Sequence, residues 1–257
     1  VVSSNTIKGA RSSQGEPLEL HIADGHLVAE MAPGAEVIEA DGLLALPGFV
    51  DMHTHLREPG FEASETVASG TACAARGGFT AVFAMANTDP VTDSVARAAH
   101  IAALGRAAGN AEVFPVGSIT IGLAGERLSP IAEMAAAGVR MFSDDGRCVM
   151  NSALMRAALQ LSAVHGVIIA QHSQVLVLAG PEAAADERSV AADLGLTGWP
   201  WAAESTIIAR DVQLAELTGG HLHACNITTA ESVEGVRWAK ARGVQVTAEV
   251  TPHHLLL

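Results

Sequence analysis

From residue 49 onward, short apolar segments alternate with alanine-rich segments, and this alternation constrains the fold more than any other feature of the sequence. The apolar segments begin near residues 49, 80, 112, 139, 167, 221 and 244. Most of these starts lie roughly 23 to 32 residues apart, the length of one strand–helix unit. Seven such units in succession predict an α/β fold of the TIM-like (β/α)8 barrel type, from which the last strand and the C-terminal part are absent.

The alanine-rich segments predict the helices between these strands. Several of them end at glycine, for example at Gly138, Gly166 and Gly243, and glycine is the usual residue after a helix. The predicted helices cover about 63–76, 94–107, 130–137, 152–165, 203–218 and 230–242. The interval between residues 170 and 221 is longer, so we expect an inserted loop over the carboxyl ends of the strands. Trp199 and Trp201 either cap a pocket there or pack beneath the loop.

Residues 1–48 differ in pattern from the rest and predict part of a small β subdomain. The runs 18–22 and 26–29 flank Asp24-Gly25, which is a hairpin signal. Residues 37–38 and 43–46 predict further short strands. The expected domains are therefore residues 1–48 and an incomplete barrel over residues 49–257.

Charge and cysteine content exclude several classes of partner. The net charge of −13 argues against nucleic acid and anionic membranes as partners, and no apolar run reaches the roughly 18 residues of a membrane span. Cys73, Cys148 and Cys225 are widely separated, which indicates a reducing, cytoplasmic location. We expect all three to be small buried hydrophobic residues.

The segment 48–60 carries the most specific chemical signal. It begins as an apolar strand and passes into a loop that ends at Pro59-Gly60. His53 and His55 are two residues apart, so on a strand they share a face and can hold one metal ion. Arg57 follows just beyond the strand, where its guanidinium could bind a carboxylate.

Polar residues also follow the other predicted strands, and in a barrel such residues meet at one rim. The candidates are Asn87, Asp144, Asp145 and His172. Asp144 and Asp145 are adjacent and point to opposite faces, so we expect one to bind a metal and the other to cap a turn. Three histidines and a carboxylate form a site suited to zinc, which lowers the pKa of a bound water to about 7.

Together these motifs resemble the bacterial class I dihydroorotases of the amidohydrolase superfamily. The resemblance spans residues 42–257 and is carried by HTHLREPG (53–60), MANT (85–88), FSDDG (142–146), QH (171–172), IARD (208–211) and TAEVTPHH (247–254). It implies a metal-dependent hydrolase that reversibly cyclises N-carbamoyl-L-aspartate to dihydroorotate in pyrimidine synthesis. It further implies that His53 and His55 hold one zinc and that Asp145 bridges to a second zinc held by His172. The substrate carboxylate would be bound by Arg57 and Asn87, and His55 would also contact the substrate.

Hydantoinases and dihydropyrimidinases share the His-x-His strand but resemble this chain less well. They use a carboxylated lysine on the fourth strand, where this sequence has Ser143-Asp144-Asp145. The only lysines are Lys8 and Lys240, and neither follows a predicted strand.

Three departures from the family pattern limit what the resemblance implies. Asn226 stands where the family has a second-metal histidine, and His223 lies on the opposite face of the same strand. Residues 173–175 replace an acidic pair, and the family's general-base aspartate is expected beyond Leu257. The chain could therefore hold one or two zinc ions.

Two interpretations remain open. The chain is either a dihydroorotase, expected as a homodimer, or a catalytically impaired homologue that serves as a structural partner of aspartate transcarbamoylase.

Overall fold

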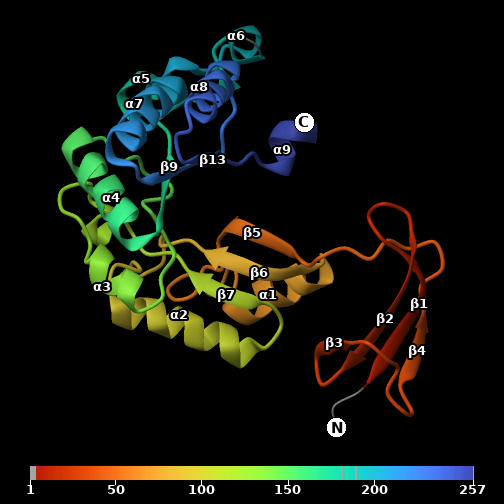
Figure 1. The fold of residues 1–257 in the computed structure, drawn as a ribbon. Helices are drawn as coiled ribbons and strands as arrows, with labels where there is room; N and C mark the ends of the chain where they lie inside the picture. Colours follow the sequence, from red (N-terminus) through yellow and green to blue (C-terminus); the bar gives the residue numbers. More distant parts are fainter. Residues whose placement is uncertain (1–3, 181, 184, 189, 257) are drawn as a thin grey trace. The chain divides into compact units, whose positions relative to one another are not determined.

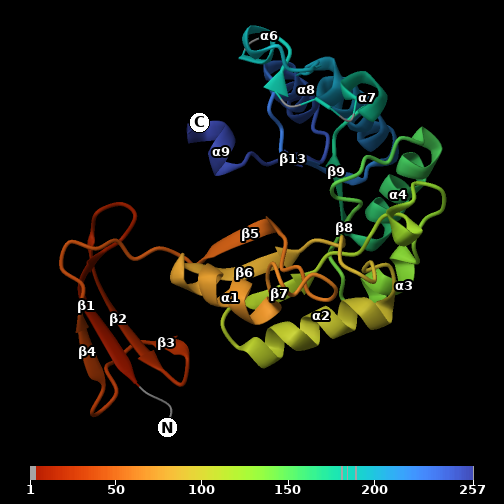
Figure 2. The same ribbon diagram turned by 180° about the vertical axis from the view of Figure 1, so that it is seen from behind.

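The computed structural model describes residues 4–180, 182–183, 185–188 and 190–256 (Figures 1 and 2). Contacts within the chain divide it into two compact units, Val1–Phe49 and Val50–Leu257. Among the described residues, no helix is both long enough and apolar enough to cross a membrane.

The first unit is a four-stranded sheet with the order β3-β2-β1-β4. Its strands are β1 (Asn5–Arg11), β2 (Pro17–Ala23), β3 (His26–Val28) and β4 (Glu36–Glu39). The predicted hairpin is confirmed, since Ala23 pairs with His26 across a turn in which Asp24 and Gly25 both have positive φ. The strand predicted at residues 43–46 is wrong, because only Leu44 forms an isolated bridge, to Arg11.

The second unit contains the seven strands and six helices that the alternating pattern predicted. The strands are β5 (Phe49–Thr54), β6 (Phe79–Ala84), β7 (Glu112–Pro115), β8 (Met141–Ser143), β9 (Ile168–His172), β12 (His221–Cys225) and β13 (Val246–Ala248). The helices are α1 (Val67–Arg76), α2 (Val95–Ala108), α3 (Ile131–Ala136), α4 (Ser152–His165), α7 (Ala202–Thr218) and α8 (Ala230–Ala241). Short elements that were not predicted are η1 (Ile121–Leu123), α5 (Leu176–Ala179), β10 (Ala185–Asp186), α6 (Val190–Leu194), β11 (Gly198–Trp199) and α9 (Pro252–Leu256).

The seven predicted strands form two sheets, β5-β6-β7 and β13-β12-β9-β8, and β10 pairs with β11 in a separate two-stranded sheet. Pairing is parallel between β6 and β7 and throughout the second sheet. A parallel bridge between Gly117 and Phe142 links the two sheets. A Cβ on Gly117 would lie 2.7 Å from the Phe142 ring, so only glycine allows this approach. No pairing joins β5 to β13 in the described part of the chain. The observed architecture is thus a mixed α/β fold rather than a closed barrel.

The main core lies between the second sheet and helices α3, α4, α7 and α8. Its fully buried side chains include Phe142, Met155, Leu159, Ile208 and Leu222. Polar residues follow the carboxyl ends of these strands, for example Asp144 and Asp145 after β8.

The cysteine prediction is only partly correct. Cys225 is buried and Cys148 is half-buried, but Cys73 is exposed. Helix α1 buries Val67, Gly70 and Thr71, and Cys73 lies off the helical face that these residues define.

Candidate metal centre

Three imidazoles converge on one carboxylate at the carboxyl ends of β5, β8 and β9. The Nε2 atoms of His53 and His55 lie 3.2 and 3.3 Å from the two oxygens of Asp145, and Nδ1 of His172 lies 3.6 Å from Oδ1. The structure therefore brings together all four residues that the sequence predicted as metal ligands. Parallel strands explain the convergence, because their carboxyl ends meet at one edge.

Each of these imidazoles has its other nitrogen next to a hydrogen-bond acceptor. Nδ1 of His53 donates to Glu249, Nδ1 of His55 lies 3.1 Å from the amide oxygen of Asn87, and Nε2 of His172 lies 3.1 Å from that of Gln174. A neutral imidazole carries one N–H, so each ring that donates to its acceptor in the neutral form presents a lone pair to Asp145. Three such lone pairs and a carboxylate repel one another unless a metal ion or a proton lies between them.

The residues therefore fit a metal ion. Ligand atoms of His53, His55 and Asp145 lie within 4.8 Å of one another, and tetrahedral zinc with bonds near 2.0–2.1 Å separates its ligands by roughly 3.4 Å. Oδ1 of Asp145 and Nδ1 of His172 are buried and form no hydrogen bond with any described residue. These two atoms are thus available to a ligand.

The pKa values of these residues also indicate that the site favours a positive charge. Burial disfavours charge on His53, but the neighbouring Asp145, Cys225 and Glu249 outweigh it and raise its pKa to about 12. Burial also opposes ionisation of Asp145, yet the neighbouring His172 and His53 hold its pKa well below the usual range. Burial lowers the pKa of His55, and the charge of Arg57 lowers it further. Without a metal, a proton on His53 supplies the positive charge.

Asn87 orients the site in addition to any contact with substrate. Its Nδ2 donates to Oδ2 of Asp145 at 3.3 Å, while its Oδ1 faces His55. The amide thereby fixes both the His55 ring and one oxygen of the carboxylate.

Asp144 contacts different partners from Asp145 and does not face the histidines. Its carboxylate accepts hydrogen bonds from the backbone N–H of Thr120, at 2.9 Å, and from the Thr120 hydroxyl. Burial raises the pKa of Asp144, although these hydrogen bonds oppose the shift. Asp144 therefore fastens the loop after β7 to the segment that carries Asp145.

Arg57 is held in a strained backbone conformation beside the cluster. Its φ is 59°, in the left-handed region that residues other than glycine rarely adopt. Glu58 accepts a hydrogen bond from the first residue of α1, Val67, at 2.8 Å, which fixes this turn. Within the described residues, the Arg57 guanidinium forms no hydrogen bond or ion pair, so it remains available to an anion.

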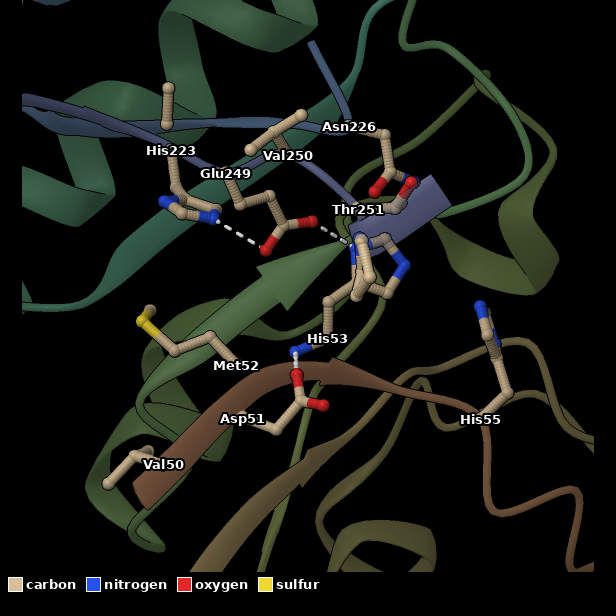
Figure 3. Close-up of a pocket in the computed structure, with 12 residues that line it drawn as sticks. Val50, Asp51, Met52, His53, His55, His223, Asn226, Glu249, Val250 and Thr251 are labelled. Atoms are coloured by element: carbon tan, nitrogen blue, oxygen red, sulfur yellow. Dashed lines mark hydrogen bonds and ion pairs between the residues drawn. The ribbon is translucent and has the colours of Figure 1, made fainter. Parts of the chain in front are cut away.

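Glu249 and His223 also belong to the site, although the sequence did not predict them as site residues. Figure 3 shows Glu249 between His223 and His53, with interactions to both. Hydrogen bonds from these two histidines lower the pKa of Glu249 to about 2, although burial opposes the shift. Glu249 directly follows β13, so the rule that polar residues at strand ends are candidates could have found it.

Asn226, one residue beyond β12, borders two cavities of the site. One is also lined by His53 and His55, and the other by His172. Its φ of 50° is a conformation that asparagine and histidine both adopt more readily than most residues. Trp199 lines the cavity with His172, as the pocket-capping alternative predicted, whereas Trp201 lies under the Arg188 guanidinium, with 5.8 Å between that group and the ring centre.

Behind His172, a buried network fixes the β9 end to the loop after Asp145. Gln171 Nε2 donates to Asp211 at 3.2 Å, and the carboxylate of Asp211 pairs with Arg210 at 2.7 Å. Arg210 also donates to the carbonyls of Val149 and Met150. Burial raises the pKa of Asp211 to about 6, with Arg210 and Gln171 opposing the shift.

Replacing Asp211 with alanine is expected to lower the free energy of unfolding by about 3 kcal/mol. Breaking a buried pair typically costs 3–5 kcal/mol, and Arg210, whose side chain is 19% exposed, keeps its carbonyl acceptors. Urea unfolding of the full-length protein measures this change. Glu216→Ala, which removes a more exposed pair with Arg242, should cost less than about 1 kcal/mol. Equal effects of the two substitutions would contradict the structural role of Asp211.

Comparison with known proteins places these features in a family. The profile of the dihydro-orotase-like family matches residues 42–232. The dihydroorotase of Leifsonia xyli subsp. xyli is 54% identical over 98% of this chain and 58% of its own length. The dihydroorotase of Streptomyces coelicolor is 51% identical over 100% of this chain and 61% of its own length. The chain thus spans about three fifths of the length of these curated relatives.

Solved structures show the same fold at much lower identity. L-hydantoinase (dihydropyrimidinase) from Arthrobacter aurescens superposes with a TM-score of 0.78 at 19% identity, over 100% of this chain and 60% of its own. A D-hydantoinase superposes with a TM-score of 0.72 at 22% sequence identity, over 99% of this chain and 58% of its own length. From the profile match over most of its length, the chain belongs to the dihydro-orotase-like family.

Proposed function

We propose that the protein is a dihydroorotase that uses zinc to cyclise N-carbamoyl-L-aspartate reversibly to dihydroorotate in pyrimidine biosynthesis. The observation that carries this proposal is the convergence of three imidazoles on Asp145. The names of the curated relatives favour this substrate. The proposed fold of the whole protein is a closed (β/α)8 barrel, of which this chain supplies seven strands.

The first zinc would be held by His53, His55 and Asp145, and a second would share Asp145 with His172. When bound, zinc supplies a Lewis acid that activates water and polarises the amide carbonyl at neutral pH. Asn226 offers an amide oxygen where an imidazole would complete the second position, so we propose one tightly bound zinc per chain.

Arg57 and Asn87 would bind the substrate carboxylate. The guanidinium of Arg57 presents paired N–H donors that match a carboxylate. Asn87 carries two N–H donors on its amide nitrogen, of which Asp145 takes one, so the second can donate to substrate. His55, which adjoins both residues, would border the bound substrate. We expect the proton acceptor to be an aspartate beyond Leu257.

A second candidate function is a structural role in an assembly with aspartate transcarbamoylase. Two observations favour it: Asn226 at the second metal position, and Gln174 rather than a carboxylate beside His172. A hydantoinase function is disfavoured because Asp145, not a lysine, occupies the centre of the site. Homodimerisation and a cytoplasmic location complete the proposal.

The deciding experiment measures cyclisation of N-carbamoyl-L-aspartate by the zinc-loaded, full-length protein, with hydantoin hydrolysis measured in parallel. We expect cyclisation that a chelator removes and zinc restores, and little hydantoin hydrolysis. Zinc binding without either activity, together with a stable complex with aspartate transcarbamoylase, would instead establish the structural role.

In the same assay, Arg57→Lys is expected to raise KM for carbamoyl aspartate about 10–100-fold with a smaller change in kcat. Lysine keeps the charge but loses the paired donors, a loss worth roughly 1.5–3 kcal/mol. Arg106→Lys, on the exposed face of α2, is the control and should leave KM unchanged. An unaltered KM in Arg57→Lys would remove Arg57 from the substrate site.

A further inference from the structure

We propose that Glu249 is a positioning residue for His53: it fixes the imidazole ring so that Nε2 faces the metal position. This inference rests on the proposed metal site and deepens it. It assigns to a residue after β13 a role that neither the strand-end motifs nor the comparisons give it.

His53 lies between two carboxylates that contact opposite nitrogens of its ring. Asp145 faces Nε2 at 3.2 Å, and Glu249 accepts a hydrogen bond from Nδ1. The side chains of His53 and Asp145 are only 9% and 5% exposed, so water competes little for either nitrogen. The contact with Glu249 selects the tautomer with its proton on Nδ1, which leaves the Nε2 lone pair for the metal.

Glu249 is itself held rigidly. Its second oxygen accepts a hydrogen bond from Nε2 of His223 at 3.0 Å, and Nδ1 of His223 lies 2.8 Å from the Thr247 hydroxyl. The backbone N–H of Glu249 donates to Ala224, and its carbonyl accepts from Ile227, at 3.1 and 3.0 Å. Glu249 is therefore held through its main chain by Ala224 and Ile227 and through its side chain by His223. Figure 3 shows the side-chain interaction.

Among the acceptors behind the three imidazoles, Glu249 is the carboxylate, whereas Asn87 and Gln174 are amides. A charged acceptor raises the basicity of the imidazole that it contacts more than a neutral one does. His53 should accordingly be the imidazole whose donor strength depends most on its partner.

The geometry also allows a competing role, in which Glu249 binds a metal directly. His53, Cys225 and Glu249 place ligand atoms within 4.8 Å of one another. In this alternative, His53 would offer its other nitrogen. The two roles predict different behaviour for glutamine at position 249, because an amide can still accept from His53 Nδ1 but is a poor zinc ligand.

The test is the zinc dissociation constant of the full-length protein, measured by competition with a chromophoric chelator. Glu249→Ala is expected to weaken zinc binding 10–100-fold, the usual effect of removing an outer-shell partner. Glu249→Gln, which keeps an acceptor but not its charge, should recover part of this loss, and His223→Gln should weaken binding by less than Glu249→Ala. Glu216→Gln, a carboxylate paired with Arg242 on the surface, should have no effect. Circular dichroism verifies that each variant is folded.

An unchanged dissociation constant in folded Glu249→Ala would overturn the proposal. Equal loss of zinc in Glu249→Ala and Glu249→Gln would also overturn it, since that result makes Glu249 a direct ligand. These readouts do not depend on the reaction catalysed. Absence of cyclisation in the wild type would thus contradict the proposed function and leave the role of Glu249 to be decided by zinc affinity.

Discussion

Asp145→Ala is expected to abolish tight zinc binding and to reduce cyclisation at least about 1,000-fold. Asp145 contacts all three imidazoles, and without it the site loses the negative charge that these imidazoles share. Loss of the metal removes several kcal/mol of transition-state stabilisation, and each 1.4 kcal/mol corresponds to a factor of ten in rate. Zinc content after gel filtration and the cyclisation rate measure the two effects.

The neighbouring carboxylate supplies a matched control for this experiment. Asp144→Asn changes an equally buried side chain one position away, but this side chain binds Thr120 rather than the histidines. The Asp144→Asn variant should be less stable than the wild type but should retain zinc. Retention of zinc by Asp145→Ala, or its loss from Asp144→Asn alone, would show that the assignment of the two residues is wrong.

Asn226→His is expected to raise the zinc content from about one to about two per chain and to increase the cyclisation rate. An imidazole at this position borders the cavity that contains His172, and histidine binds zinc more readily than a neutral amide does. Histidine also tolerates the left-handed backbone found there. Metal analysis of the dialysed protein and steady-state kinetics give the result.

Asn226→Gln serves as the control, because it changes the length of the side chain without adding an imidazole. Wild-type protein that already holds two zinc ions, with no gain from Asn226→His, would refute our interpretation of this position. A gain in zinc without a gain in rate would limit the defect to metal binding and favour the structural role.

The sequence predicts elements with a regular residue pattern better than elements whose pattern is interrupted or indistinct. The six longer helices of the second unit were predicted within a few residues, because each is an alanine-rich segment that glycine follows within two residues. Strand β1 was missed because its alternation is interrupted at Gly9, where the register with β2 shifts. The exposure of Cys73 was missed because an alanine-rich helix does not distinguish its buried face clearly.

In the candidate site, the residues at strand ends could be predicted from the sequence, but the contacts between strands could not. His53, His55, Asp145 and His172 were identified because each lies at the end of an apolar strand, and parallel pairing brings such ends together. The partnership of Glu249 with His53 could not be predicted in this way. It depends on which side chains of separate strands face each other across the site, and the alternation along one strand contains no such information.

The adjacent carboxylates Asp144 and Asp145 make the spacing of this segment as important as its composition. One anchors a loop and the other faces the histidines, and along an extended chain these orientations alternate with every residue. Inserting one residue between Phe142 and Ser143, or deleting Ser143, would exchange the two orientations without changing either carboxylate. Such a change in length should therefore disrupt the site as severely as the substitution of Asp145 does.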